Sequence, residues 1–91
     1  MTEPRWRLVV APSAVRSLAR LPDKAAAAVV EFLLGPLTDS PHRVGHALQR
    51  QLEGLHSARR GPYRVVYEIV EATNEIRVLR IDHRADVYRP R

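Results

Sequence analysis

The feature that most constrains this chain is an alternating segment from Tyr63 to Ile69. It is rich in aromatic and β-branched residues, which favour β-strands. Successive side chains of a strand point to opposite faces, so the alternation predicts one apolar face made by Tyr63, Val65, Tyr67 and Ile69. The opposite face begins with Arg64, just after the turn signal Gly61-Pro62. A guanidinium held at the start of a strand suits a planar anion such as phosphate.

A strand and two helices are expected before this segment. Residues 5–10 alternate between apolar and polar side chains, as a half-buried strand does. A first helix begins with Ser13 as its N-cap and carries Val15 on its apolar side. A second helix spans Asp23–Leu34 and is stopped by Gly35-Pro36. The predicted apolar stripe of this second helix is Ala26, Val29, Val30, Leu33 and Leu34.

The second half of the chain is predicted to form mostly strands. Prolines and Gly45 argue against regular structure over residues 37–46. Glu71–Asn74 has the composition of a hairpin turn, and Glu75–Asp82 is its partner strand. Alternation within that strand puts Leu79 and Ile81 on one face and Val78 and Arg80 on the other.

These elements predict an α+β fold for a single domain over residues 1–91. An N-terminal strand comes first, and a helical hairpin packs on one face of a small, mostly antiparallel sheet. The first strand is expected to insert beside the last one. Because the helices cover one face, the other face remains open, and that open face carries Arg64.

Composition narrows the functional classes. The formal net charge is +5, the sequence pI is about 10.7, and Lys24 is the only lysine among fifteen basic residues. A basic balance favours nucleic acid or acidic proteins as partners. The absence of cysteine excludes disulfides, thiolate catalysis and cysteine zinc sites. The longest apolar run, Ala25–Val30, is too short to cross a bilayer, and the N-terminus lacks the pattern of a signal peptide. We therefore expect a cytoplasmic protein with no membrane partner.

Arginines gather near the predicted turn and after the last strand. If the two late strands pair as a hairpin, Arg64 and Arg84 meet at the same end of the sheet. Several guanidiniums at one end would bind phosphates and stabilise charge that develops during phosphoryl transfer. The alternative is a solvated rim of arginines, some of them paired with Glu53, Glu68, Asp82 or Asp86. The candidate cluster is Arg59, Arg60, Arg64, Arg80 and Arg84, with Tyr88.

Tyr88 and two histidines could complete such a site. Tyr88 is either a proton donor or a surface on which a base stacks, or else it covers the sheet edge. His56 and His83 lie near the arginines in sequence, and each is either an acid–base group or a polar strand residue. His42 and His46 have the spacing of metal ligands on a helix, but the proline and glycine beside them argue against a helix there. We expect no metal and no cofactor.

Four sequence segments follow one another along nearly the whole chain. They are Ser40-Pro41 with Gly45 and Leu48, then Leu52-Glu53-Gly54-Leu55, then Arg59-x-Gly61-x-Tyr63-Arg64-Val65-Val66-Tyr67, and finally His83-Arg84-x-Asp86-Val87-Tyr88-Arg89. As an ordered set in a chain of this length, they resemble the RelE/ParE superfamily of toxins from bacterial type II toxin–antitoxin systems, and its RelE-like members in particular. The resemblance implies the same fold, a helical hairpin packed on an antiparallel sheet.

The resemblance also implies an activity. RelE-like members are mRNA interferases, ribosome-dependent endoribonucleases in which the ribose 2′-hydroxyl attacks the adjacent phosphate without a metal. By position, Arg64 would hold the scissile phosphate and Arg84 would assist at the phosphate or the leaving group. Tyr88 would stack on a base or help with proton transfer. The remaining candidates would contact RNA: Arg59, Arg60, Arg80, His56 and His83.

Partners and alternatives follow from the same resemblance. It implies the ribosome and mRNA, and a cognate RelB-like antitoxin that wraps the toxin in a hetero-oligomer and covers its basic face. One alternative is a ParE-like inhibitor of DNA gyrase. The uncharged Leu55 and Ser57 favour it slightly, because some RelE-like toxins carry lysines on that strand. Another alternative is a catalytically weak family member that acts mainly with its antitoxin.

Overall fold

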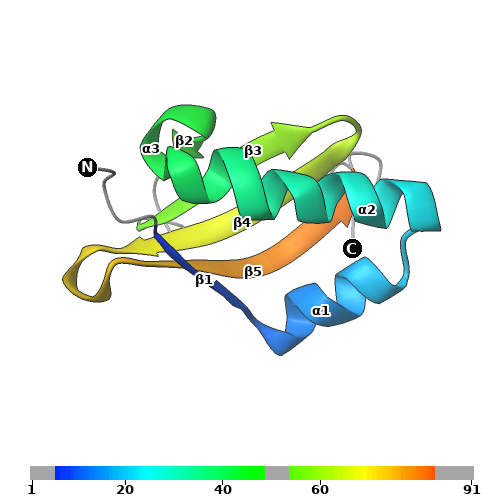
Figure 1. Cartoon of the computed structure of the whole chain (residues 1–91), viewed down its shortest axis with the longest axis horizontal. Coiled ribbons are helices and arrows are strands. Elements are labelled where there is room, and N and C mark those ends of the chain that lie inside the picture. The colour runs from blue at the N-terminus through cyan, green and yellow to red at the C-terminus, as the bar shows by residue number, and fades with distance from the viewer. Residues whose placement is uncertain (1–5, 49–53, 84–91) are drawn as a thin grey trace.

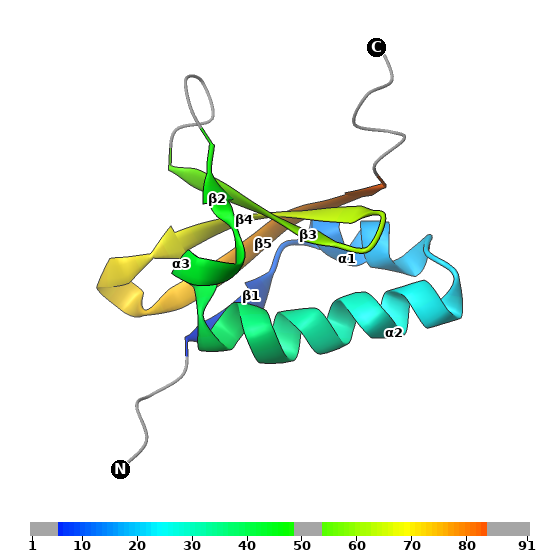
Figure 2. The ribbon, with the colours of Figure 1, turned by 90° about the horizontal axis from the view of Figure 1, so that it is seen from above.

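The structure is a computed structural model that describes residues 6–48 and 54–83. Five strands form one sheet in the order β1-β5-β4-β3-β2, in which β1 is parallel to β5 and the other pairs are antiparallel. The strands are β1 (Arg7–Val10), β2 (His46–Ala47), β3 (Leu55–Arg60), β4 (Tyr63–Val70) and β5 (Glu75–His83). Helices α1 (Pro12–Ala19) and α2 (Asp23–Phe32) lie on one side of this sheet (Figure 1, Figure 2). The arrangement confirms the predicted α+β fold and the place of the first strand beside the last.

The second helix does not stop at Gly35-Pro36. It continues as a π-helix, η1 (Leu33–Leu37), and a short helix, α3 (Pro41–Val44), follows. The wider turn of a π-helix gives the proline ring room that a regular α-helical turn lacks. The expectation of irregular structure over residues 37–46 is also wrong, because α3 and β2 form there. Within the described ranges, no helix is long and apolar enough to cross a membrane.

The core lies between the helices and the sheet, and it confirms the apolar face predicted for β4. Val65 and Tyr67 are fully buried, while Tyr63 and Ile69 pack against the core from its margin. Burial of this face against the helices is the main source of stability in a domain of this size.

The buried stripe of the second helix differs from the predicted one. Val29 and Leu33 are buried as expected, but Val30 and Leu34 are 37% and 55% exposed. Two residues outside the predicted stripe fill the core instead, Phe32 and Leu37. Phe32 and Leu33 follow Val29 at the three- and four-residue spacing of a regular helical stripe. The stripe that meets the sheet is therefore turned toward Phe32 and away from Val30 and Leu34.

The first helix also departs from its prediction. Its N-cap is Ala11 and not Ser13. The Ser13 hydroxyl donates a hydrogen bond of 2.6 Å to the backbone carbonyl of Leu79, which ties α1 to β5. Val15 is 52% exposed, whereas its neighbour Ala14 is fully buried, because α1 turns Ala14 toward the sheet.

A β-bulge in β5 changes which of its side chains share a face. The register with β4 shifts between the partners of Val78 and Arg80, so Leu79 has no partner in β4. The extra residue displaces the alternation by one position. Val78 and Ile81 therefore both belong to the core, and the prediction that they face opposite ways is wrong. The β4–β5 hairpin closes through the 3₁₀ turn η3 (Glu71–Thr73), where a turn was predicted.

Candidate functional site

A row of charged side chains crosses the face of the sheet that α1 and α2 leave open. The register places Arg59 opposite Arg64, and Arg64 opposite Asp82. Each of the three is flanked in sequence by a core residue: Ala58, Val65 and Ile81. Because strand side chains alternate, all three charged residues point to the open face. Arg80 lies on the same face, two register positions from the Arg64–Asp82 pair, so the structure brings together three of the candidate arginines.

Asp82 completes this row, although the sequence predicts only an ion-pair partner for the arginines. Its Oδ2 accepts a hydrogen bond of 2.7 Å from Arg80 Nε. The interpretation of the arginines as a paired rim therefore holds for Arg80. The signal in the sequence is the two-residue spacing of Arg80 and Asp82, which puts both on one face of a strand.

Arg59 and Arg64 differ from Arg80 in this respect. Among residues 6–48 and 54–83, neither of them forms an ion pair within 4.0 Å. By contrast, Arg7 and Arg77, near the start of β5, pair with Glu75 at 3.9 and 3.5 Å. Among the described residues, positive charge outside ion pairs therefore gathers at the end of the sheet that holds the β3–β4 turn, next to the carboxylate of Asp82. A concentration of one sign of charge at one end attracts anions.

Arg60 and His83 lie on the helix side of the sheet. The register places both opposite Tyr63, at the margin of the core. The His83 and Tyr63 rings meet edge-on, with centroids 5.2 Å apart. Arg60 and Lys24 line a cavity of about 350 Å³ between the β3–β4 turn and α2. These two candidates are thus separated from Arg64 by the thickness of the sheet.

His56 is also on the helix side, beneath α3. It lies opposite Tyr67 on β4, and the two rings stack with centroids 5.5 Å apart. Burial, and after it the nearby His42, lowers the pKa of His56. Its Nδ1 atom is buried and has no hydrogen-bond partner in the described part of the chain. The ring of His56 is thus placed between those of Tyr67 and His42, away from the arginine row.

Tyr67 fixes α3 to the sheet. Its hydroxyl donates a hydrogen bond of 2.6 Å to the backbone carbonyl of Pro41, the first residue of α3. Burial raises the pKa of Tyr67 to about 12. A Cβ atom on Gly45 would collide with the Tyr67 hydroxyl and with the Ser57 carbonyl, so this approach requires a residue without a side chain. The contact therefore holds β2, β3 and α3 together on the helix side of the sheet.

Two of the predicted catalytic residues, Arg84 and Tyr88, lie outside the described residues. Their roles stay predictions. In the ranges that are described, no three histidine, aspartate or glutamate side chains gather closely enough to hold a metal ion.

Comparison with known proteins places the chain in a family. Residues 8–88 match the family described as the ParE toxin of the type II toxin–antitoxin system parDE. Toxin RelE of Mycobacterium tuberculosis (strain ATCC 25618 / H37Rv) is 49% identical over 84 residues, which cover 92% of this chain and 87% of that protein. The chain belongs to the RelE/ParE superfamily of type II toxins.

Two further comparisons agree with this assignment. Toxin RelG of the same organism is 51% identical over 77 residues, covering 85% of this chain and 88% of that protein. The crystal structure of the toxin–antitoxin complex RelBE2 from Mycobacterium tuberculosis contains a chain that matches with a TM-score of 0.87 and 44% identity, covering 93% of this chain and 98% of that one. The likeness confirms the RelE-like fold, in which helices pack on a mostly antiparallel sheet.

In this toxin the rest of β3 adds no charge to the open face. Ser57 lies opposite Val66 and Leu55 opposite Glu68, so Ser57 and Leu55 share the face of Arg59. Val66 points away from the helices and is nevertheless only 5% exposed. The open face of the toxin therefore combines a basic end, at the β3–β4 turn, with a centre that carries no further arginine on β3.

Proposed function

We propose that the toxin is a metal-independent endoribonuclease that cleaves mRNA on the ribosome and so inhibits translation. The observation that carries the proposal is the pair Arg59 and Arg64, directly opposite each other on the open face. Neither forms an ion pair within the described ranges, although the carboxylate of Asp82 lies opposite Arg64. Two guanidiniums at cross-strand spacing can hold one phosphate and stabilise the charge that develops on it. Because its substrate is ribosome-bound mRNA, the toxin would act in the cytoplasm.

In the proposed reaction, Arg64 binds the non-bridging oxygens of the scissile phosphate. The ribose 2′-oxygen gives up its proton and bonds to phosphorus, while the bond from phosphorus to the 5′-oxygen breaks. The leaving 5′-oxygen takes up a proton from water, and the products carry a 2′,3′-cyclic phosphate and a 5′-hydroxyl. We assign to Arg84 a role in neutralising the phosphate or the leaving group, and to Tyr88 a role in base stacking or proton transfer. The reaction needs no metal and no cofactor.

The other candidate residues fall into two groups by position. Arg59 and Arg80, on the open face, would contact backbone phosphates beside the scissile one. Arg60 and His83, on the helix side, would be reached only by RNA that passes around the end of the sheet. His56 is packed beneath α3, so its contribution would be to hold β3 in place.

Asp82 would supply the proton acceptor. Its carboxylate lies opposite Arg64, and Arg80 engages only one of its two oxygens. The other oxygen, Oδ1, forms no hydrogen bond with the described residues and would accept the 2′-hydroxyl proton. Asp82 would then pass this proton to the hydroxide that remains when water protonates the leaving 5′-oxygen. A base must lie within hydrogen-bonding reach of the proton that it removes, and Asp82 is the carboxylate that shares the row with Arg64.

The partner that we infer is a RelB-like antitoxin. The RelBE2 structure is a complex of toxin and antitoxin. The net charge of +5 and the uncompensated arginines would favour an acidic segment that folds as it binds. The toxin would then be stored as an inactive hetero-oligomer, with its basic face covered.

Inhibition of DNA gyrase, as by a ParE-like toxin, is the second candidate function. The observation that favours it is the uncharged pair Leu55 and Ser57 on the open face, where a nuclease would gain from cations. In that case the open face would bind protein, and Arg64 would have no catalytic part. A catalytically weak member that acts mainly with its antitoxin would share the same features.

The test is cleavage of a defined mRNA by the purified toxin, with and without programmed ribosomes. Ribosome-dependent cuts are expected, and Arg64→Ala should reduce their rate by about 100-fold or more, because it removes charge stabilisation from the transition state. Arg16→Ala is the matched control. It removes an exposed arginine from α1, on the other side of the sheet, and should cut at the wild-type rate.

The alternatives give different results in the same experiment. A folded wild-type toxin that makes no cuts would overturn the nuclease proposal. Inhibition of gyrase supercoiling by that protein would then support the second candidate. Harmless expression without an antitoxin, together with no inhibition of gyrase, would support the catalytically weak member.

A further inference from the structure

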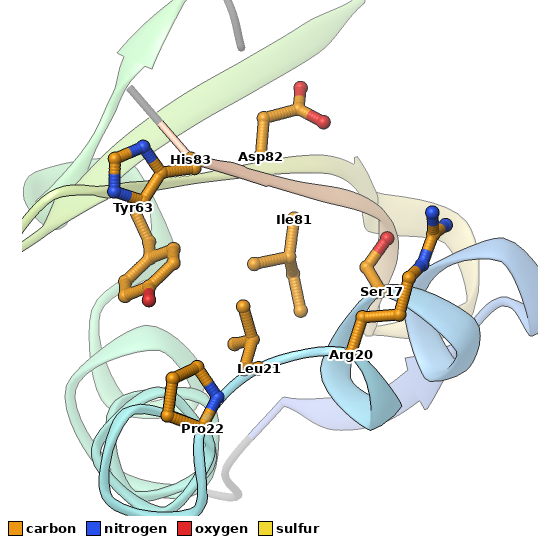
Figure 3. Close-up of a pocket in the computed structure, with 8 residues that line it drawn as sticks. All are labelled: Ser17, Arg20, Leu21, Pro22, Tyr63, Ile81, Asp82 and His83. Atoms are coloured by element: carbon orange, nitrogen blue, oxygen red, sulfur yellow. The ribbon is translucent and has the colours of Figure 1, made fainter. Parts of the chain in front are cut away.

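A hollow of about 550 Å³ lies on the helix side of the sheet, at the end of β5 (Figure 3). We call it the β5 hollow. Leu21, Pro22 and Ile81 line it with apolar groups. Asp82 of the charged row is also among its lining residues, although Arg59, Arg64 and Arg80 are not, so the β5 hollow adjoins the site described above without containing its arginines.

Polar and aromatic groups stand around these apolar residues. The rings of Tyr63 and His83 form one side, and Ser17 and Arg20 of the first helical segment lie across from them (Figure 3). Arg20 forms no ion pair with any other described residue. The β5 hollow thus offers a flat aromatic surface, aliphatic contacts, hydrogen-bonding groups and one uncompensated cation.

These groups define the chemistry of a ligand. Aromatic and aliphatic walls favour a planar ring. The Ser17 hydroxyl donates its proton to the Ser13 carbonyl at 3.0 Å, so its oxygen can still accept a hydrogen bond from the ring edge. A free guanidinium favours an attached anion, above all a phosphate. A purely apolar ligand would leave Arg20 unmatched, and a free phosphate would leave the apolar walls unused. A nucleobase linked to a phosphate satisfies all four features, and the volume lies in the range of ordinary small-molecule sites.

The β5 hollow is also continuous with the charged row. β1 pairs only with Glu75–Val78, so the last residues of β5 are not flanked by β1. There, Ile81 and His83 line the β5 hollow, while Asp82 between them lies opposite Arg64 and its side chain extends to the other face (Figure 3). Neighbouring strands lie only about 4.8 Å apart. Arg64 on β4 is thus one strand away from the edge of β5 that β1 leaves uncovered. A polynucleotide with one phosphate at Arg64 could pass around that edge and bring a nearby base into the β5 hollow.

We propose that the β5 hollow is a nucleobase subsite, in which a base of the RNA next to the cut stacks on Tyr63 while Arg20 binds its phosphate. The place of this base in the substrate rests on the proposed nuclease function. The binding chemistry of the β5 hollow does not rest on that function, because a free mononucleotide should contact the same side chains. The subsite would give the toxin a preference for particular bases beside the scissile phosphate.

The first experiment uses adenosine 5′-monophosphate as the probe and measures backbone amide shifts by NMR. The nucleotide should shift the amides of Leu21, Ile81 and His83, whereas ribose 5-phosphate at the same concentration should not. Arg20→Glu should weaken binding by about tenfold or more, since it replaces a charge-assisted hydrogen bond with repulsion. Arg16→Glu makes the same charge change one turn away, outside the β5 hollow, and should stay within about twofold of wild type. Equal shifts with ribose 5-phosphate, or equal binding by Arg20→Glu, would overturn the proposal.

The second experiment separates this proposal from the nuclease function. Tyr63→Leu keeps an apolar side chain at the margin of the core but removes the stacking surface. Cleavage on programmed ribosomes should then continue with a changed distribution of cut sites, once thermal unfolding has shown that the variant is folded. Unchanged positions and relative yields of the mRNA cuts would contradict the subsite proposal without contradicting the nuclease proposal. A wild type that binds the nucleotide as described but never cuts would sink the nuclease and support a nucleotide site in the β5 hollow.

Discussion

The hydrogen bond from the Tyr67 hydroxyl to the Pro41 carbonyl joins β4 to α3, and removing it shows how much this single buried contact contributes to stability. Tyr67→Phe removes only the hydroxyl, which lies 2.6 Å from the Pro41 carbonyl oxygen at a fully buried residue. A buried neutral hydrogen bond contributes about 1 kcal/mol net, and the loss reaches about 3 kcal/mol when its partner is left unsatisfied. We therefore expect the free energy of unfolding to fall by about 1–3 kcal/mol at neutral pH.

The pKa of the same hydroxyl adds a pH dependence with a defined sign. Burial raises the pKa of Tyr67 from 10.0 to about 12. Below pH 10 the folded and unfolded states both keep the proton, so the contribution of Tyr67 to stability is complete. As the pH rises toward 12, the unfolded state loses its proton first, and up to about 3 kcal/mol of stability is lost. Tyr67→Phe has no proton to lose at this position, so its stability should fall less over the same interval.

Urea unfolding followed by circular dichroism, at neutral pH and at several values between pH 10 and 12, measures both effects. The stabilities of wild type and Tyr67→Phe should converge as the pH approaches the folded-state pKa of Tyr67. Equal stability at neutral pH, or a parallel loss at alkaline pH, would refute the reasoning, because the hydroxyl would then be neither bonded nor buried. Tyr67→Ala should fail to fold, since emptying the space of a core ring costs about 3–5 kcal/mol, much of the stability of a small domain.

Further substitutions test the site and its support. Arg64→Ala should relieve growth arrest on expression without changing the melting temperature, because Arg64 faces away from the core. Arg84→Ala should relieve growth arrest as well, because Arg84 is assigned to the phosphate or the leaving group; full toxicity of either variant would remove that residue from the site. Gly45→Ala should lower the melting temperature, by about 4–8 °C for each kcal/mol lost, because its Cβ collides with the Tyr67 hydroxyl, and unchanged melting would show that α3 can move away. Asp82→Asn should lower kcat for mRNA cleavage by about 100-fold or more with little change in KM, since an amide cannot take the proton. A lower KM with unchanged kcat would instead show that Asp82 only repels RNA.

Features set by local periodicity could be predicted from the sequence. The alternation from Tyr63 to Ile69 determines which side of β4 meets the helices, and the structure buries that side. The same alternation sends Arg64 to the open face, and Arg59 joins it because a short turn at Gly61-Pro62 fixes the hairpin register. For these residues the strand pattern and the turn chemistry agree, so little depends on distant contacts.

Features set by tertiary packing could not be predicted in this way. Pro36 normally ends a helix, but η1 continues through it and buries Leu33 and Leu37 in the core, a gain that depends on tertiary packing. The helix stripe that includes Leu34 fails for the same reason. Asp82 is a site residue only because the register sets it opposite Arg64, and register depends on pairing across strands. His56 lies close to Arg59 in sequence, yet it stacks on Tyr67 on the other side of the sheet.

The bulge at Leu79 determines what both faces of β5 can do. With strict alternation, Arg80 and Asp82 would share the face of Val78, which is fully buried, and two charges would be forced into the core at high cost. The extra residue instead sends Arg80 and Asp82 to the open face, beside Arg64, and leaves Ile81 and His83 on the helix side with Tyr63. The Ser13 hydroxyl satisfies the Leu79 carbonyl at this irregular point, so the bulge is supported by α1. One inserted residue, held in place by one hydrogen bond from α1, therefore builds the charged row and the β5 hollow on opposite sides of the same strand.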